Sequence, residues 1–130
     1  MVKRRRTDHG GGFTIIELMV VLACIGLLLS IAAPRYVQHI DHAREVTLRQ
    51  DLQQLRVAID QFKADQTRYP QTLDELVTRG YLRSVPVDPI TGNAQTWHLD
   101  PAPGAGEGTV ADVHSGATGV AQDGSSYASW

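Results

Sequence analysis

A chain of 130 residues with one cysteine and a formal charge of −2 leaves room for one modest domain. The lone Cys24 excludes an intramolecular disulfide and a cysteine-based zinc site. Four of the 12 basic residues, Lys3 to Arg6, lie in the first 12 positions, and the rest of the chain carries a balance of −5. A nucleic-acid partner is therefore not expected, because phosphate binding needs a basic face on the folded part.

The first two segments are a basic stretch and a long apolar run. Residues 1–12 are polar, end in three glycines and show no apolar periodicity, which indicates a leader. Residues 13–33 follow, and Glu17 is the only charged member of this run. As a helix the run is about 31 Å long, close to a bilayer core, so we expect one transmembrane crossing. The basic residues before it favour a cytoplasmic N-terminus and a head across the membrane.

Apolar residues resume at helical spacing after Pro34, so we expect the proline to kink the helix rather than end it. The polar residues between them, including Glu45, Arg49 and Arg56, are assigned to the solvent face. The pattern predicts roughly 50 residues of nearly unbroken helix ending near Asp65. The apolar positions are Val37, Ile40, Leu48, Leu52, Leu55, Ile59 and Phe62.

Prolines and glycines interrupt the later part of the head, which spans residues 34–130. A short helix is predicted over residues 72–79, with Thr72 as cap, Glu75 three residues on and Gly80 after its end. The fold class is therefore α+β, with a long helix packed on a small antiparallel sheet. Candidate strands are residues 96–99, 109–114 and 126–130, with a Gly/Pro-rich loop over 101–108.

The N-terminal segments also permit an ordinary secretory signal, in which cleavage follows the apolar core. Residues 30–32 (Ser-Ile-Ala) suit such a cleavage, which would leave a lipid-anchored or soluble periplasmic binding domain starting at Ala33. Glu17 argues against this alternative, because a carboxylate at the centre of a membrane helix costs about 2.5–3.5 kcal/mol and less near an end. A cationic partner would account for its presence.

The stretch GFTIIELMVVLACIGLLLSIAAP resembles the N-terminal signature of type IV pilins and of the pseudopilins of type II secretion. The resemblance implies cleavage by a prepilin peptidase between Gly12 and Phe13, and N-methylation of Phe13. It implies that Glu17 pairs with the N-terminal amine of a neighbouring subunit, which would favour one stagger between helices. It also implies a pilin-like fold, a bacterial inner-membrane anchor with a periplasmic head, and assembly into a helical fibre. The implied partners are other copies of this chain, minor pseudopilins, the peptidase/methyltransferase and an inner-membrane assembly platform.

Residues 68–93 resemble the segment after the long helix in the major pseudopilin of type II secretion. The resemblance implies a structural fibre subunit that drives protein export across the outer membrane, powered by a cytoplasmic ATPase. The alternative is a major or minor type IV pilus subunit in adhesion, motility or DNA uptake. The shared features are Tyr69-Pro70, the short helix, Tyr81-Leu82 and Pro86-Val87-Asp88-Pro89.

The C-terminal segment is similar to the last loop and strand of the same family, in which acidic and polar groups bind calcium. This resemblance makes Asp112, Ser115 and Asp123 candidate calcium ligands. The loop departs from the family pattern, because it is one residue shorter than in many members and has Thr118 in place of an aspartate. In the alternative without a metal, Asp123 belongs to a turn and Asp112 ends a strand.

No enzymatic activity is expected. Asp112, His114 and Ser115 bring an acid, a base and a hydroxyl together in sequence, as a hydrolase would need. Strand geometry, however, places Asp112 and His114 on one face and Ser115 on the other. The segment also lacks a nucleophile elbow.

Overall fold

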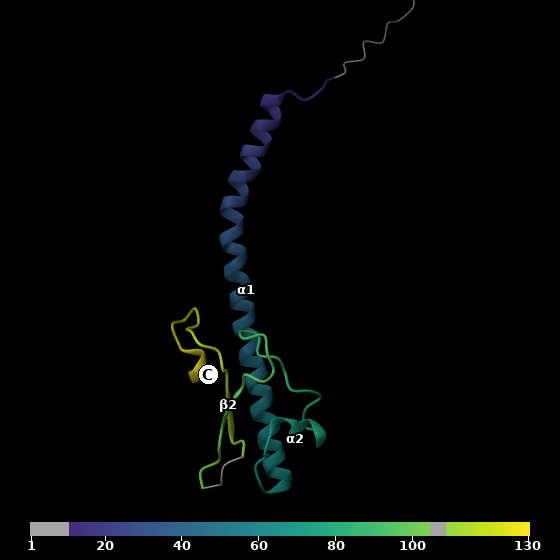
Figure 1. Ribbon diagram of the computed structural model, residues 1–130, viewed down its shortest axis with the longest axis vertical. Coiled ribbons are helices and arrows are strands. Elements are labelled where there is room, and N and C mark those ends of the chain that lie inside the picture. Colours follow the sequence, from purple (N-terminus) through teal and green to yellow (C-terminus); the bar gives the residue numbers. More distant parts are fainter. Residues whose placement is uncertain (1–10, 105–108) are drawn as a thin grey trace, which may run out of the picture. The chain divides into compact units, whose positions relative to one another are not determined.

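The structure, a computed structural model, describes residues 11–104 and 109–130, so most of the predicted leader lies outside the described residues. The chain divides into two compact units, Met1–Gln38 and His39–Trp130. The elements described, shown in Figure 1, are α1 (Ile15–Gln66), α2 (Leu73–Thr78), β1 (His98–Asp100), β2 (Asp112–His114) and a 3-10 helix, η1 (Tyr127–Ser129).

Helix α1 contains 52 residues and continues through Pro34, as the apolar spacing predicted. It ends at Gln66, one residue beyond the predicted end. Thr67 lies in the left-handed region at φ 55°, which stops the helix, while its N–H still donates to the carbonyl of Lys63 at 2.9 Å.

The apolar side chains of the N-terminal unit are exposed. Over the described residues 11–38 every position is exposed, and Phe13 reaches 85%. A contiguous apolar surface of this kind must be covered by lipid or by other protein. Helix α1 is the one helix in the described part of the chain long and apolar enough to cross a membrane.

The core of the head lies along one stripe of α1. The stripe begins at Leu48, because Val37 is exposed and Ile40 only partly buried, although both continue the spacing. Each large apolar side chain that is fully buried contributes about 1.5–3 kcal/mol. The buried core contains Leu48, Leu52, Leu55, Ala58, Ile59 and Phe62 from α1, with Leu73, Leu76, Leu82, Trp97, Val110 and Val113.

The sheet is smaller than predicted. Strands β1 and β2 pair antiparallel with His98 opposite His114 and Asp100 opposite Asp112. The predicted third strand over residues 126–130 is wrong, since the chain there forms η1. The carbonyl of Trp130 accepts a hydrogen bond from Arg56 on α1 and contacts the His114 ring, so its partners are side chains rather than the backbone of a neighbouring strand.

Helix α2 forms as its capping residues predicted. The side-chain oxygen of Thr72 accepts from the N–H of Glu75 at 3.2 Å, and Gly80 after the helix has φ 84°. The Glu75 carboxylate accepts from the N–H of Gln71 at 2.8 Å and pairs with Arg68. These bonds fix the turn between α1 and α2.

One assignment on α1 is wrong. The helical pattern predicts Glu45 on the solvent face, but only 7% of it is exposed. Its Oε1 accepts from the N–H of Gln122 at 2.9 Å and from the hydroxyl of Tyr127 at 3.0 Å. The C-terminal segment covers this carboxylate, and the two donors satisfy it where it is buried.

Candidate functional site

The predicted processing and assembly residues lie at the start of α1. Gly12 and Phe13 precede the helix, and both are exposed. Thr14 caps the helix, because its Oγ1 accepts from the N–H of Glu17 at 3.1 Å. This cap was not predicted, although Thr14 and Glu17 have the spacing of a capping box.

Glu17 lies in the first turn of α1. The first N–H groups of a helix carry partial positive charge, which favours a carboxylate there. A cleaved chain would carry an ammonium group at Phe13, close to the same positive end, where it is unfavourable without an anion. The Glu17 carboxylate is exposed in this first turn and therefore accessible from outside the chain.

The motif over residues 68–93 makes structural contacts. The hydroxyl of Tyr69 accepts from Nζ of Lys63 at 2.6 Å. Tyr81 packs edge-on against Phe62 with ring centroids 5.4 Å apart, and its hydroxyl donates to Asp65 at 2.8 Å. Both tyrosines thus fasten the chain after α1 to the last turns of that helix.

Asp88, in the Pro-Val-Asp-Pro turn, is fully buried. Its Oδ1 accepts from the N–H groups of Ile90 and Thr91 at 2.8 and 3.2 Å. Its Oδ2 accepts from the hydroxyl of Ser115 at 2.5 Å. Ser115, one of the candidate calcium ligands, is thus part of a buried hydrogen bond between two loops.

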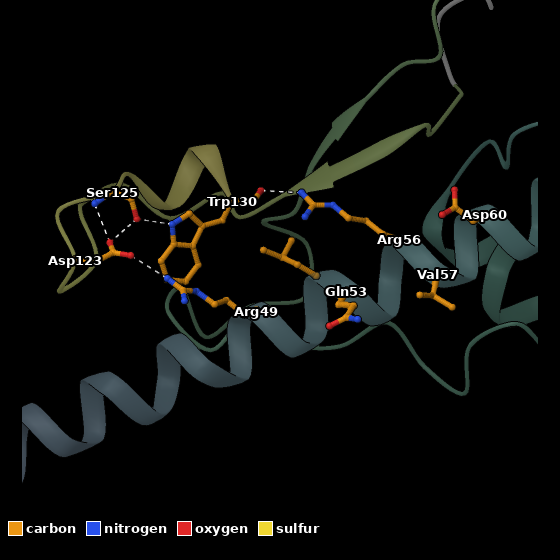
Figure 2. A pocket seen from close by; sticks show the side chains of 9 residues that line it. Arg49, Gln53, Arg56, Val57, Asp60, Asp123, Ser125 and Trp130 are labelled. Carbon is orange, nitrogen blue, oxygen red and sulfur yellow. Dashed lines mark hydrogen bonds and ion pairs between the residues drawn. The ribbon is translucent and has the colours of Figure 1, made fainter.

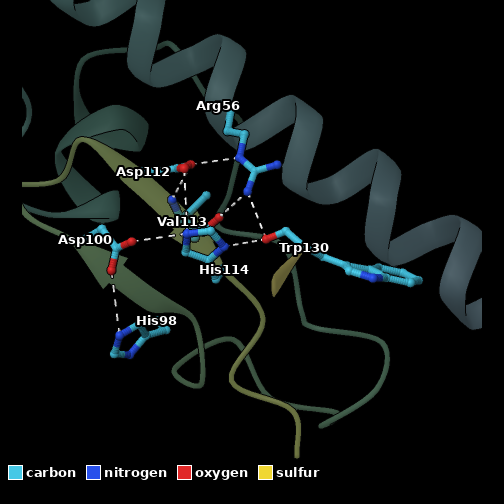
Figure 3. Close-up of polar contacts among 7 residues, drawn as sticks. All are labelled: Arg56, His98, Asp100, Asp112, Val113, His114 and Trp130. Carbon is cyan, nitrogen blue, oxygen red and sulfur yellow. Dashed lines mark hydrogen bonds and ion pairs between the residues drawn. The ribbon is translucent and has the colours of Figure 1, made fainter. Parts of the chain in front are cut away.

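Arg56 joins α1 to β2 and to the C-terminal residue (Figure 3). Its Nε donates to Oδ1 of Asp112 at 2.7 Å. Its Nη2 donates to the carbonyls of Val113 and Trp130 at 3.0 and 2.9 Å. One guanidinium group therefore holds the strand and the C-terminal residue together.

Arg49 makes a second cationic contact with the C-terminal segment, residues 109–130 (Figure 2). Its Nη2 donates to Oδ2 of Asp123 at 3.0 Å, and its guanidinium lies 4.2 Å from the centre of the Trp130 ring. The indole N–H of Trp130 donates to the Ser125 hydroxyl at 2.7 Å. We call Arg49 and Arg56 with Asp112, Asp123 and Trp130 the arginine clasp.

Electrostatics favour ionised carboxylates in the clasp. Burial alone would raise the pKa of Asp112, but hydrogen bonds from Arg56 and the Val113 N–H outweigh it, and the pKa lies below its usual value. Hydrogen bonds from the hydroxyl and N–H of Ser125 lower the pKa of Asp123, with a smaller contribution from Arg49.

The three candidate calcium ligands have different partners. Asp112 pairs with Arg56, Ser115 with Asp88, and Asp123 with Arg49 and Ser125. Residues 11–104 and 109–130 contain no group of three or more His, Cys, Asp or Glu side chains suited to a metal ion. Calcium takes six to eight oxygen ligands around one centre, whereas in this structure the three side chains are bonded to separate partners.

His114 does not face Ser115. Its Nε2 lies 3.1 Å from Asp100 and 3.6 Å from Asp112, and its Nδ1 contacts the carbonyl of Trp130 (Figure 3). The Ser115 hydroxyl is instead bonded to Asp88. The acid, base and hydroxyl therefore do not form a catalytic chain, as strand alternation predicted.

Comparison with known proteins gives two family matches. The prokaryotic N-terminal methylation motif matches residues 9–33, and the type II secretion system protein G family matches residues 35–126. These matches favour a secretion pseudopilin over a type IV pilus subunit. No solved structure matches the chain.

Several relatives are named type II secretion system core protein G. The one from Klebsiella michiganensis is 33% identical over 71% of this chain and 75% of its own length. The one from Klebsiella pneumoniae is 31% identical over 92% of this chain and 93% of its own length. The relative from Escherichia coli is 33% identical over 65% of this chain and 70% of its own length. Because the protein G match covers most of the chain and the methylation motif precedes it, the chain belongs to the pseudopilin family of type II secretion system protein G.

Proposed function

We propose that this chain builds the fibre of a type II secretion system and drives protein export across the outer membrane. The observation that carries the proposal is the protein G match over residues 35–126, next to an apolar helix that is exposed throughout residues 11–38. In the proposed arrangement the N-terminus is cytoplasmic, residues 13–33 cross the bacterial inner membrane and the head is periplasmic.

The proposed processing site is the bond between Gly12 and Phe13, with N-methylation of Phe13. Two observations support it: the methylation motif includes both residues, and both are exposed and precede the first turn of α1. A peptidase could therefore reach this bond without unwinding the helix.

The proposed assembly contact joins Glu17 of one subunit to the new amine at Phe13 of the next. Within a membrane, an unpaired carboxylate and an unpaired ammonium group are both costly, and pairing between chains offsets both costs. Because the apolar side chains lack directionality, this single charge pair would select one stagger among many.

The processing step is tested by N-terminal sequencing and intact mass of the protein from membranes of cells with and without the prepilin peptidase. A methylated Phe13 that depends on the peptidase is the expected result. A start at Ala33 in both strains would contradict the proposal and indicate ordinary signal cleavage.

Assembly is tested with Glu17→Gln, which keeps the shape of the side chain and removes its charge. We expect normal membrane accumulation, strongly reduced fibre formation and reduced export of a secreted enzyme. Asp41→Asn is the matched control, because it removes one carboxylate from an exposed part of α1 beyond the apolar segment. Normal export with Glu17→Gln would exclude the charge pair as the assembly device.

A further inference from the structure

The C-terminal segment, residues 109–130, has its two clasp carboxylates neutralised by the chain's own cations. Asp112 lies 2.7 Å from Arg56 and Asp123 lies 3.0 Å from Arg49. The two arginines are seven residues apart, so both project from one side of α1. Two positive charges therefore meet two negative ones, which is the charge balance that a calcium ion would provide.

The two arginines of the clasp also connect separate parts of the C-terminal segment. Arg56 contacts a side chain of β2 and the carbonyl of Trp130, positions 18 residues apart in the sequence. Arg49 contacts Asp123 and the Trp130 ring. Each guanidinium group thus bridges two parts of residues 109–130. It can do so because it is planar and rigid and carries several N–H donors.

The side-chain oxygens of two candidate calcium ligands, Ser115 and Asp123, are already bonded within the chain. Only 1% of Ser115 is exposed, and its hydroxyl donates to Asp88. The second oxygen of Asp123 accepts from the N–H of Ser125 at 2.9 Å. A divalent cation beside these carboxylates would also face the two guanidinium groups, and repulsion between like charges would weaken its binding.

We propose that Arg49 and Arg56 replace a metal ion in this head, so that the C-terminal segment is fastened to α1 independently of calcium. The expectation of calcium binding came from resemblance to the family, whereas the arginine contacts belong to this chain. The inference concerns stability of the head and does not rest on the export function, so a failure of either can be recognised separately.

The test uses full-length protein in detergent, with thermal unfolding followed by tryptophan fluorescence. We expect the same melting temperature in excess chelator and in millimolar calcium, and no saturable heat when calcium is titrated into the protein. Arg49→Gln combined with Arg56→Gln should lower the melting temperature by about 4–8 °C, the shift for roughly 1 kcal/mol in a domain of this size.

Arg44→Gln is the matched control, because it removes one arginine from the same helix and Arg44 pairs only loosely with Asp41, at 4.0 Å. If the double variant does not accumulate, Arg56→Gln and Arg49→Gln alone carry the same comparison. A wild-type melting temperature that falls in chelator, or saturable calcium binding that raises it, would overturn the proposal. So would a double variant as stable as the wild type.

Discussion

Ser115 and Asp88 form a hydrogen bond of 2.5 Å inside the head, between loops 27 residues apart in the sequence. Asp88 is 0% exposed and Ser115 is 1% exposed. The bond connects the Pro-Val-Asp-Pro turn, part of the family motif, to the loop that leads into the C-terminal segment. Ser115 also accepts from the N–H of Ala117 at 3.1 Å, so its hydroxyl organises both sides of the contact.

Ser115→Ala should lower the free energy of unfolding by about 1–3 kcal/mol, because the buried carboxylate of Asp88 loses a donor that water cannot replace. Chemical denaturation of full-length protein in detergent measures the loss. Ser84→Ala, at an exposed serine of the same head, should have little effect. Equal stability of the Ser115 variant and the wild type would show that the bond makes no net contribution.

Gly116→Ala should destabilise the head by about 1–3 kcal/mol, the usual cost of overpacking. A Cβ at Gly116 would lie 1.8 Å from the carbonyl oxygen of Thr96, and backbone cannot move aside as a flexible side chain can. Gly104→Asn is the control, since no atom lies within 4 Å of a Cβ there and asparagine tolerates its φ of 77°. Thermal unfolding compares the two variants. A Gly116→Ala variant as stable as the wild type would mean that the loops around Thr96 and Gly116 separate easily.

Asp51→Asn should raise the melting temperature at neutral pH. Burial and the nearby Asp88 carboxylate raise the pKa of Asp51 above its ordinary value of 3.8. Protonation of Asp51 therefore stabilises the folded state fully below pH 3.8. This stabilisation is lost as the pH rises through the pKa of Asp51 in the folded protein. The advantage of the variant should shrink as pH falls toward 3.8. Asp60→Asn, at an exposed site on α1, should not reproduce this pH-dependent gain.

Asp112→Asn should lower the melting temperature at neutral pH. The pKa of Asp112 lies below 3.8, because the hydrogen bonds from Arg56 and Val113 outweigh burial. The ionised Asp112 therefore stabilises the folded state fully above pH 3.8. This stabilisation is lost as the pH falls through the pKa of Asp112 in the folded protein. Melting curves of wild type and variant should converge in that acidic range. Asp41→Asn provides a charge control, and a pH-independent difference would exclude ionisation of Asp112 as the cause.

The helices could be predicted because their signals are local. Apolar spacing predicts the course of α1 through Pro34, and Thr72 with Gly80 predicts α2 to within a residue at each end. The apolar run with Glu17 near its start points to the pseudopilin family. These features depend on residues close together in the sequence, so the sequence pattern contains them directly.

Residues 109–130 could not be predicted to the same extent, because their partners are distant in the chain. The family resemblance makes Asp112 and Asp123 calcium candidates, and the sequence alone does not show that α1 brings arginines to them across 56 and 74 residues. The predicted strand at residues 126–130 was wrong for a similar reason, since side chains of α1 and β2 contact the Trp130 carbonyl.

The sequence by itself determined the apolar N-terminal segment, the long helix, α2 and the family, because periodicity, capping and motif order are local properties. Only the tertiary structure decided that Glu45 is buried, that Ser115 bonds to Asp88 and that two arginines of α1 hold the C-terminal segment. The physical reason is that a polar side chain takes whichever partner folding brings within hydrogen-bonding distance, and the packing of loops on α1 selects that partner.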